Sequence, residues 1–470
     1  MIRPSLRALA ATMSVSALLA GCTVGKDYER PQMVSPDQFR FVDGPAQAQT
    51  LADAPWFEIF QDPELQALIK EALANNLDLQ AALARVEEAR ARAGIAKSFY
   101  YPQVDGQLST GWRGASSDDD SRAESVTENV NYGFGLSWEI DLFGKLRRQR
   151  ESALAIAFAS EQNRRGVLVT LIGDVASTYF LLREFDLQID IARRTLALND
   201  ETVAYFRNRL DGGVSNRLEV DRIVANRAQT AAAVPDIERQ RAYAENLLSF
   251  LVGRGPGPIT RTGLSLGETL PPSVPPGLPA QLLERRPDVA LAEQLLVAAN
   301  ADIGAAKALF FPTLSLTGFL GGVNGDLTSL LGGGGTVFSL TPSLLQPIFN
   351  AGRLKQNVRV MQARFDAAIA EYRKSALNGY REVANALVTI QKLAEVREQQ
   401  RIGVEALTDA ADLARARYDS GLASYLEILT ADQELFTRQL LLAQTLGAEL
   451  RARAELYRTL GGGWQTTTQP

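Results

Sequence analysis

The chain has no histidine among its 470 residues and only one cysteine, Cys22. The lack of histidine excludes His-based general bases, catalytic triads and most zinc or copper sites, and a lone cysteine forms no intrachain disulfide. No run of 18 apolar residues follows the N-terminus, so no membrane-spanning helix is predicted. The formal net charge is −5 and no basic cluster occurs, which argues against nucleic-acid binding. We expect neither an enzyme nor a metal or cofactor site.

The N-terminus has the pattern of a secretory signal peptide. Arg3 and Arg7 precede a short apolar stretch that is too short to span a membrane. The stretch ends in Leu19-Ala20-Gly21-Cys22, which resembles the cleavage site of bacterial lipoproteins. We expect Cys22 to carry an S-diacylglycerol and an N-palmitoyl group, because several acyl chains together anchor a protein firmly. Thr23 at the next position favours sorting to the outer membrane.

Residues 129–142 alternate without a break between apolar and polar or small side chains. Neighbouring side chains on a strand point to opposite faces, so Phe134 and Trp138 share one face, and Glu139 and Asp141 share the other. Lipid outside and water in the lumen of a membrane barrel produce this pattern. A half-buried strand of a soluble antiparallel sheet produces it too. Together with the alternation from residue 103 to 112, the pattern predicts a hairpin over 103–142.

Long helices are predicted on both sides of this hairpin. Residues 64–98 predict a single helix, which Pro102 stops. After the hairpin, apolar residues recur at steps of three and four from residue 168 to 210, with polar exceptions at Thr178 and Asn199. This heptad pattern predicts a coiled-coil helix from about residue 145 to 210, roughly 100 Å long at the usual rise per residue. A globular core has no room for such a helix.

A glycine turn and a second long helix follow. Gly212 and Gly213 allow the backbone conformation that ends a helix. The next helix is expected from about residue 217 to 251, with a bend at Pro235.

The pattern then repeats. Tyr100-Tyr101-Pro102 corresponds to Phe310-Phe311-Pro312, and Arg209-Leu210-Asp211-Gly212-Gly213 corresponds to Arg417-Tyr418-Asp419-Ser420-Gly421. A period of this size indicates duplication of a whole unit. Each half is therefore expected to contain a helix, a hairpin, a long helix, a tight turn and a second long helix.

Four strands per chain cannot close a barrel. Open strand edges are not tolerated in lipid, and the smallest membrane barrels have about eight strands. Several chains must therefore share one barrel if the strands cross the membrane. Both hairpins lead into helices at both ends, so all helices are expected on one side of the membrane, the periplasm.

Five segments resemble the outer-membrane factors of the TolC-like family, in the NodT-type lipoprotein subgroup that serves resistance-nodulation-division efflux pumps. They are Leu19–Cys22, Trp138–Gly144, Arg285–Val289, Phe311–Gly318 and Gln346–Arg353. The resemblance implies an α+β membrane protein, built as a homotrimer with a 12-stranded outer-membrane β-barrel and a periplasmic α-helical barrel. It also implies a periplasmic adaptor and an inner-membrane transporter as partners, with the lipid of the outer membrane around the barrel.

This fold gives the expected boundaries of each part. They are a signal peptide at 1–21, a lipidated tether at 22–63, a first repeat at 64–253 with helices at 145–252, a linker at 254–279, a second repeat at 280–462 with a β-hairpin at 313–349 and helices at 353–460, and a tail at 463–470.

The candidate working residues lie at the helix turns. Gly212, Gly213, Ser420 and Gly421 are expected to dock the adaptor. The resemblance also implies a periplasmic gate formed by Tyr418 and Glu427, with Arg217 and Glu219 as the equivalents in the first half. Thr430 stands where the family often has a second gate acid, which removes one carboxylate per chain.

The expected function is a passive exit duct for an efflux pump. Two other functions fit the pattern less well: the outer-membrane duct of a type I protein secretion system, and a lipid-anchored periplasmic coiled-coil scaffold with soluble hairpins.

Overall fold

The structure is a computed structural model that describes residues 23–33, 35–41, 60, 62–115, 125–261, 279–324 and 336–462. Its helices are α3 (Pro63–Asn75), α4 (Leu77–Ser98), α5 (Lys145–Asp211), α6 (Arg217–Leu251), α7 (Pro279–Arg285), α8 (Pro287–Ala308), α9 (Arg353–Asp419) and α10 (Tyr425–Thr459). The strands are β1 (Gln103–Ala115), β2 (Ser125–Ile140), β3 (Thr313–Asn324) and β4 (Thr336–Leu345). The signal peptide, Cys22 and the tail from residue 463 lie outside the described residues, as do half of the tether and most of the linker.

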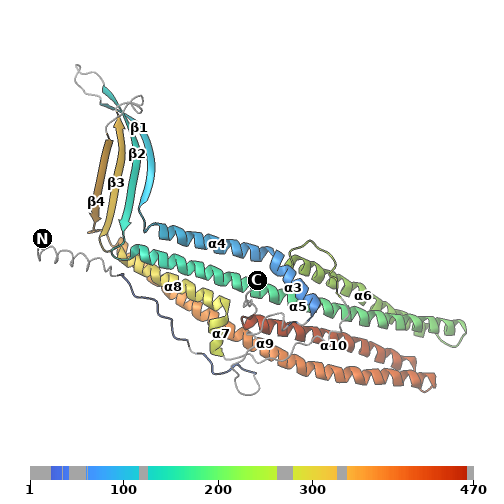
Figure 1. Cartoon of the computed structure of the whole chain (residues 1–470). Helices are drawn as coiled ribbons and strands as arrows, with labels where there is room; N and C mark the ends of the chain where they lie inside the picture. Colours follow the sequence, from blue (N-terminus) through green and yellow to red (C-terminus); the bar gives the residue numbers. More distant parts are fainter. Residues whose placement is uncertain are drawn as a thin grey trace. The chain divides into compact units, whose positions relative to one another are not determined.

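The predicted repeat is present in the order and the lengths of the elements (Figure 1). Helices α4 and α8 each have 22 residues. Helices α5 and α9 each have 67 residues, and α6 and α10 each have 35. The helix α6 continues through Pro235. Equal lengths in both halves support the duplication that the sequence predicts.

The four strands form one antiparallel sheet in the order β1-β2-β3-β4 (Figure 1). Residues that pair directly across an antiparallel sheet place their side chains on the same face. Leu108 pairs with Tyr132, Phe134 with Leu320, and Leu320 with Phe338. One face is therefore apolar across the whole sheet, and it is open, since Phe134 is 62% and Phe338 81% exposed.

The opposite face carries mostly polar or small residues. Asp105 pairs with Gly135, and Glu139 pairs with Ser315. The predicted hairpins are confirmed, but two strand ends differ from the prediction. Strand β4 ends at Leu345 rather than at residue 349. Strand β2 ends at Ile140 rather than at residue 142; the carboxylate of Asp141 accepts bonds from the N–H groups of Leu146 and Arg147 at the start of α5.

The prediction of one helix over 64–98 was wrong, because the chain breaks at Asn76. This residue is extended, and its side chain accepts a hydrogen bond from the N–H of Leu79 while donating to the carbonyl of Leu251. The side chain thus starts α4 in a new direction, in the way of a helix N-cap.

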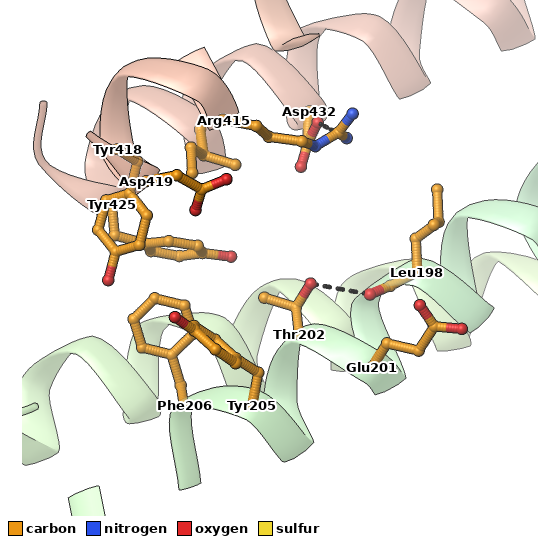
Figure 2. A pocket seen from close by; sticks show the side chains of 11 residues that line it. Leu198, Glu201, Thr202, Tyr205, Phe206, Arg415, Tyr418, Asp419, Tyr425 and Asp432 are labelled. Atoms are coloured by element: carbon orange, nitrogen blue, oxygen red, sulfur yellow. Dashed lines mark hydrogen bonds and ion pairs between the residues drawn. The ribbon is translucent and has the colours of Figure 1, made fainter. Parts of the chain in front are cut away.

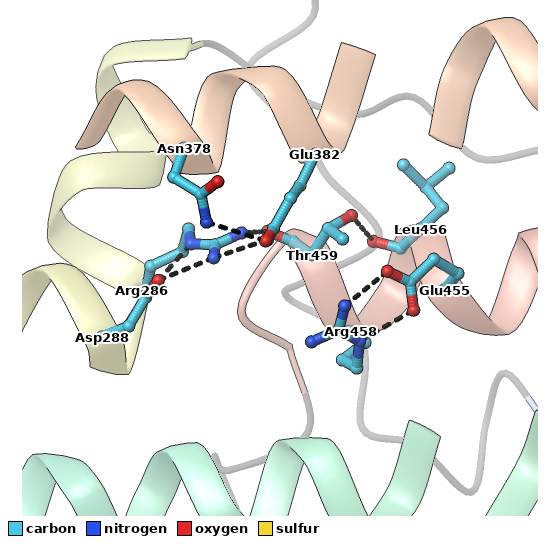
Figure 3. Close-up of polar contacts among 8 residues, drawn as sticks. All are labelled: Arg286, Asp288, Asn378, Glu382, Glu455, Leu456, Arg458 and Thr459. Carbon is cyan, nitrogen blue, oxygen red and sulfur yellow. Dashed lines mark hydrogen bonds and ion pairs between the residues drawn. The ribbon is translucent and has the colours of Figure 1, made fainter. Parts of the chain in front are cut away.

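The second half breaks at the corresponding position, Arg286, between α7 and α8 (Figure 3). Its guanidinium is buried and donates to the carbonyl of Thr459 at 2.7 Å and to the carboxylates of Asp288 and Glu382. Asn378 donates to the other oxygen of Glu382. Burial alone would lower the pKa of Arg286, but these hydrogen bonds outweigh it and raise the pKa. The buried charge is therefore fully compensated.

The chain forms two compact units that do not coincide with the two repeats. The first contains residues 1–32, 85–161 and 291–373, and the second contains residues 33–84, 162–290 and 374–470. Each unit combines segments of both repeats, because the two hairpins pair in one sheet and the helical hairpins share one core. The main core lies in the second unit and includes Leu65, Ile172, Tyr179, Leu248 and Leu450.

The heptad predicted in α5 is confirmed by burial: of its positions from residue 168 to 210, all but Leu196 and Leu210 are buried. Its polar member Asn199 donates to Thr230 at 3.0 Å, within a buried ladder that continues through Asn226 to Gln433. By length and composition, α5 and α8 could each cross a membrane. We interpret α5 as a core helix instead, because 61% of its apolar window is buried.

Candidate functional site

The candidate site lies where the two helical hairpins turn. Gly213 and Gly421 have φ angles of 72° and 73°, in the left-handed region that favours glycine. At the first turn, the N–H of Val214 donates to the carbonyl of Arg209; at the second, Leu422 donates to Arg417 in the same way. Both ends are Schellman motifs. The structure thus places Gly212, Gly213, Ser420 and Gly421 in the tight turns that the sequence predicted.

Apolar side chains beside these turns are exposed in both halves. Val214 and Leu218 occupy the first hairpin, and Leu422 and Leu426 occupy the corresponding positions of the second; all four are more than half exposed. The two turns thus expose apolar side chains at matched positions.

The predicted gate residues of the first half serve to start α6. Asn216 accepts a hydrogen bond from the N–H of Glu219, and the Glu219 carboxylate accepts one from the hydroxyl of Ser215. Such reciprocal bonds resemble a capping box. Arg217 is exposed and lies 3.6 Å from Asp221.

Glu427 has a more open environment in the first turn of α10. Its carboxylate is 51% exposed and lies 3.7 Å from the guanidinium of Arg417. Pairs of this kind contribute little to stability because water screens them. The Glu427 carboxylate is therefore free to interact with groups outside the chain.

Tyr418 belongs to an aromatic cluster that joins the two hairpins. The ring of Phe206, from α5, lies 4.3 Å from the ring of Tyr425 and 5.9 Å from that of Tyr418. The guanidinium of Arg209 lies over the rings of Tyr205 and Tyr418 and donates to the Tyr205 hydroxyl. Within the described residues, the hydroxyls of Tyr418 and Tyr425 have no hydrogen-bond partner.

A cavity of about 330 Å³ opens beside this cluster, and we name it the tip pocket (Figure 2). Its aromatic wall consists of Tyr205, Phe206, Tyr418 and Tyr425. The carboxylates of Glu201, Asp419 and Asp432 also line it. Asp432 accepts a hydrogen bond from Arg415 at 2.6 Å. Burial raises the pKa of Asp432 above its usual range, in spite of the opposing effect of Arg415.

Sequence reasoning missed most of the tip pocket. Tyr425, Asp432 and Arg415 carry no motif that distinguishes them from an ordinary helix surface. Phe206 does stand on the predicted heptad, but its partners lie more than 200 residues away in the chain. The only sign of the pocket in the sequence is a difference between the two repeats. Tyr418, Tyr425 and Asp432 occur in the second half, and the corresponding positions of the first half are Leu210, Arg217 and Val224.

A second polar site holds the N-terminal segment 23–30 within the first unit. The N–H of Val24 donates to the carbonyl of Phe143, and buried Arg148 donates to the carbonyls of Val24 and Gly25. The Arg30 guanidinium forms two hydrogen bonds to Glu293, which also accepts from Tyr28. A side chain at Gly304 would clash with Arg148, so the glycine makes room for this contact.

An exposed apolar sheet face and two equal helical hairpins define the chain as a subunit of an outer-membrane channel. The sequence profile described as "Outer membrane efflux protein" matches residues 68–254 and 278–462, one match in each repeat. The chain belongs to this family, which consists of channels rather than enzymes.

Individual relatives match over almost the whole chain. The probable outer membrane lipoprotein SilC of Salmonella typhimurium is 33% identical and covers 96% of this chain and 98% of its own. The toluene efflux pump outer membrane protein TtgI of Pseudomonas putida is 36% identical, and the match covers 96% of this chain and 97% of TtgI. The open state of the Neisseria gonorrhoeae outer membrane channel MtrE superposes with a TM-score of 0.86 at 31% identity, covering 96% of this chain and 100% of its own.

Proposed function

We propose that the protein is the outer-membrane exit duct of a tripartite resistance-nodulation-division efflux pump. It releases compounds that the inner-membrane transporter delivers, and performs no chemistry itself. The observation that carries this proposal is the four-stranded sheet, whose open apolar face suits lipid and whose other face suits a water-filled lumen. Relatives of this chain include a toluene efflux pump component and a probable outer membrane lipoprotein.

The proposed assembly is a homotrimer. Within the described residues, the outer edges of β1 and β4 pair with no other strand. Lipid does not tolerate such edges, so neighbouring chains must cover them. Three chains would supply the strands of a 12-stranded barrel, as the resemblance implies.

The proposed anchor is the acylated Cys22, which precedes the bound segment 23–30. Thr23 contacts Gly144, and Val24 bonds to Phe143, both just beyond the end of β2. This contact supports an anchor at the edge of the lipid-facing sheet. We propose no cofactor beyond these acyl groups.

The proposed docking surface for the periplasmic adaptor consists of the two turns with Val214, Leu218, Leu422 and Leu426. The proposed periplasmic gate is formed by Tyr418 and Glu427, with Arg217 and Glu219 in the first half. The Tyr418 hydroxyl has no partner among the described residues, and the Glu427 carboxylate is half exposed. Both groups are therefore available to a neighbouring chain.

The test compares charges on the two faces of β2. Phe134→Asp places a carboxylate on the apolar face, where lipid would have to solvate it, so we expect little trimer in the outer membrane. Gly135→Asp places the same carboxylate on the polar face, where only the neighbouring carbonyl of Asp105 approaches. We expect normal trimer yield and altered ion selectivity in planar bilayers.

Trimer yield is measured by heat-modifiable migration of the outer-membrane fraction, and channel function by conductance of the purified protein. Normal trimer yield from Phe134→Asp would refute the lipid-facing assignment. Absence of conductance from the wild-type trimer would refute the proposed channel and favour a periplasmic scaffold.

A further inference from the structure

The tip pocket has the charge of a cation site. Asp419 and Glu201 line it, and neither has an ion-pair or hydrogen-bond partner among the described residues. Asp432 has one cationic partner, Arg415, but Arg415 is shared with Asp412 at 3.0 Å. The carboxylates around the cavity thus outnumber the positive groups that line it, and an added cation would gain free energy there.

The wall of the pocket is aromatic, and it includes the hydroxyl group of Tyr425. Tyr425 is only 8% exposed, lines the cavity, and has no partner for its hydroxyl in the described part of the chain. This hydroxyl faces the open cavity, where it can form a hydrogen bond with water or with a bound ligand. Cation–π contacts already occur in this cluster, because the guanidinium of Arg209 lies over the rings of Tyr205 and Tyr418.

The chemistry of the pocket distinguishes an organic cation from a metal ion. Among the described residues, no group of three or more carboxylates is close enough to hold a metal ion. Aromatic faces instead attract ammonium groups with apolar substituents, whose charge is spread over a larger volume. A cavity of about 330 Å³ has the size of a small-ligand site.

We propose that the tip pocket binds a small organic cation, with the ammonium group between the rings of Tyr418 and Tyr425 and the carboxylates of Glu201 and Asp419. The ligand would touch α5 of the first hairpin together with α9 and α10 of the second. It would hold the two hairpins together and oppose any opening that separates them. Binding itself does not depend on the proposed function, whereas the effect on opening rests on it.

The binding experiment uses phenyltrimethylammonium as the probe and benzenesulfonate as its anionic counterpart. Ligand-observed NMR with the full chain in deuterated detergent follows the aromatic protons of both. We expect the cation to bind and the anion not to. The double variant Glu201→Gln with Asp419→Asn should weaken binding of the cation by at least about tenfold.

A matched control is Asp409→Asn, which removes an exposed carboxylate of α9 outside the pocket. It should bind the cation like the wild type. Glu201 and Asp419 are exposed, so thermal unfolding of the double variant should be unchanged and the comparison stays valid. The proposal is overturned if the wild type does not bind the cation. It is also overturned if the double variant binds the cation as well as the wild type does, or if benzenesulfonate binds as strongly as the cation.

The coupling to opening is measured by conductance. Phenyltrimethylammonium should lower the conductance of the wild type and leave that of the double variant unchanged. If the cation binds and the wild-type conductance does not change, the coupling between the hairpins is refuted. If the wild type shows no conductance without any ligand, the proposed channel fails while the binding result stands.

Discussion

The two helical hairpins, α5–α6 and α9–α10, have equal lengths and equal turns, yet different contacts stabilise their tips. At the first tip, Asn216 and Glu219 hold the start of α6 with hydrogen bonds from within the same turn. At the second tip, Ser424 is the N-cap of α10, and its side chain forms no capping bond. The first tip is therefore held locally.

The second tip is held by the first hairpin instead. Tyr418 and Tyr425 pack against Phe206, whereas the corresponding positions of the first half are Leu210 and Arg217. Duplication has thus produced two hairpins with the same backbone but with different side chains where their tips pack together.

The largest expected effect concerns the two helix breaks that precede the hairpins. Arg286→Ala would leave the partly buried carboxylate of Glu382 without its cation and the carbonyl of Thr459 without its donor, and we expect a loss of about 3 kcal/mol. Asn76→Ala removes one cap and one bond to a carbonyl and should cost only about 1–2 kcal/mol. Urea unfolding in detergent measures both.

Arg381→Ala is the control for Arg286→Ala, because Arg381 is exposed on the same helix as Glu382. We expect a change within about 0.5 kcal/mol. If Arg286→Ala and Asn76→Ala lower the free energy of unfolding equally, the two helix breaks contribute equally to stability, and the difference that we infer from their contacts is wrong.

The next effect concerns the gate. Glu427→Ala combined with Tyr418→Phe removes two polar groups that are available to a neighbouring chain. If each contact contributes about 1 kcal/mol, planar-bilayer conductance should rise about tenfold or more. Asp409→Ala, which removes an exposed carboxylate of α9 outside the gate, is the control, and we expect it to leave conductance unchanged. Conductance of the double variant no higher than that of the wild type would remove Tyr418 and Glu427 from the gate.

A smaller effect concerns the helix starts. Asn216→Ala removes the side chain that accepts the N–H of Glu219 and should destabilise the chain by about 1 kcal/mol. Ser424→Ala removes no capping bond and should leave the unfolding midpoint almost unchanged. A similar loss from both variants would contradict the difference that we infer between the tips.

The smallest effect is a pH dependence confined to the second tip. Burial raises the pKa of Asp432, so the folded chain holds this proton to higher pH than the unfolded chain does. Stability should therefore fall as the pH rises from about 4, the usual pKa of aspartate, through the raised pKa. Asp432→Asn should make the thermal midpoint less dependent on pH in this range, and Asp412→Asn, on the other side of Arg415, serves as the control. A pH profile that Asp432→Asn does not alter would exclude this carboxyl as the source.

Local patterns were sufficient to predict the strands, the turns and the repeat. The period of two places Phe134 and Glu139 on opposite faces of β2, and this depends only on strand geometry. Gly213 and Gly421 mark the turns because few other residues adopt a left-handed backbone. The helix break at Asn76 was missed although asparagine favours N-caps over helix interiors. The bond from Asn76 to the carbonyl of Leu251 depends on the tertiary structure, and no local pattern predicts it.

The sequence by itself determined the elements: two hairpins with one apolar face each, two pairs of equal helices, and a turn within each pair. The tertiary structure alone decided which side chains meet at the tips. Phe206 and Glu201 come from the first half of the chain, and they meet Tyr425 and Arg415 of the second half at the tip pocket. Their contacts depend on how one hairpin packs against the other, and no periodicity within either hairpin specifies that packing.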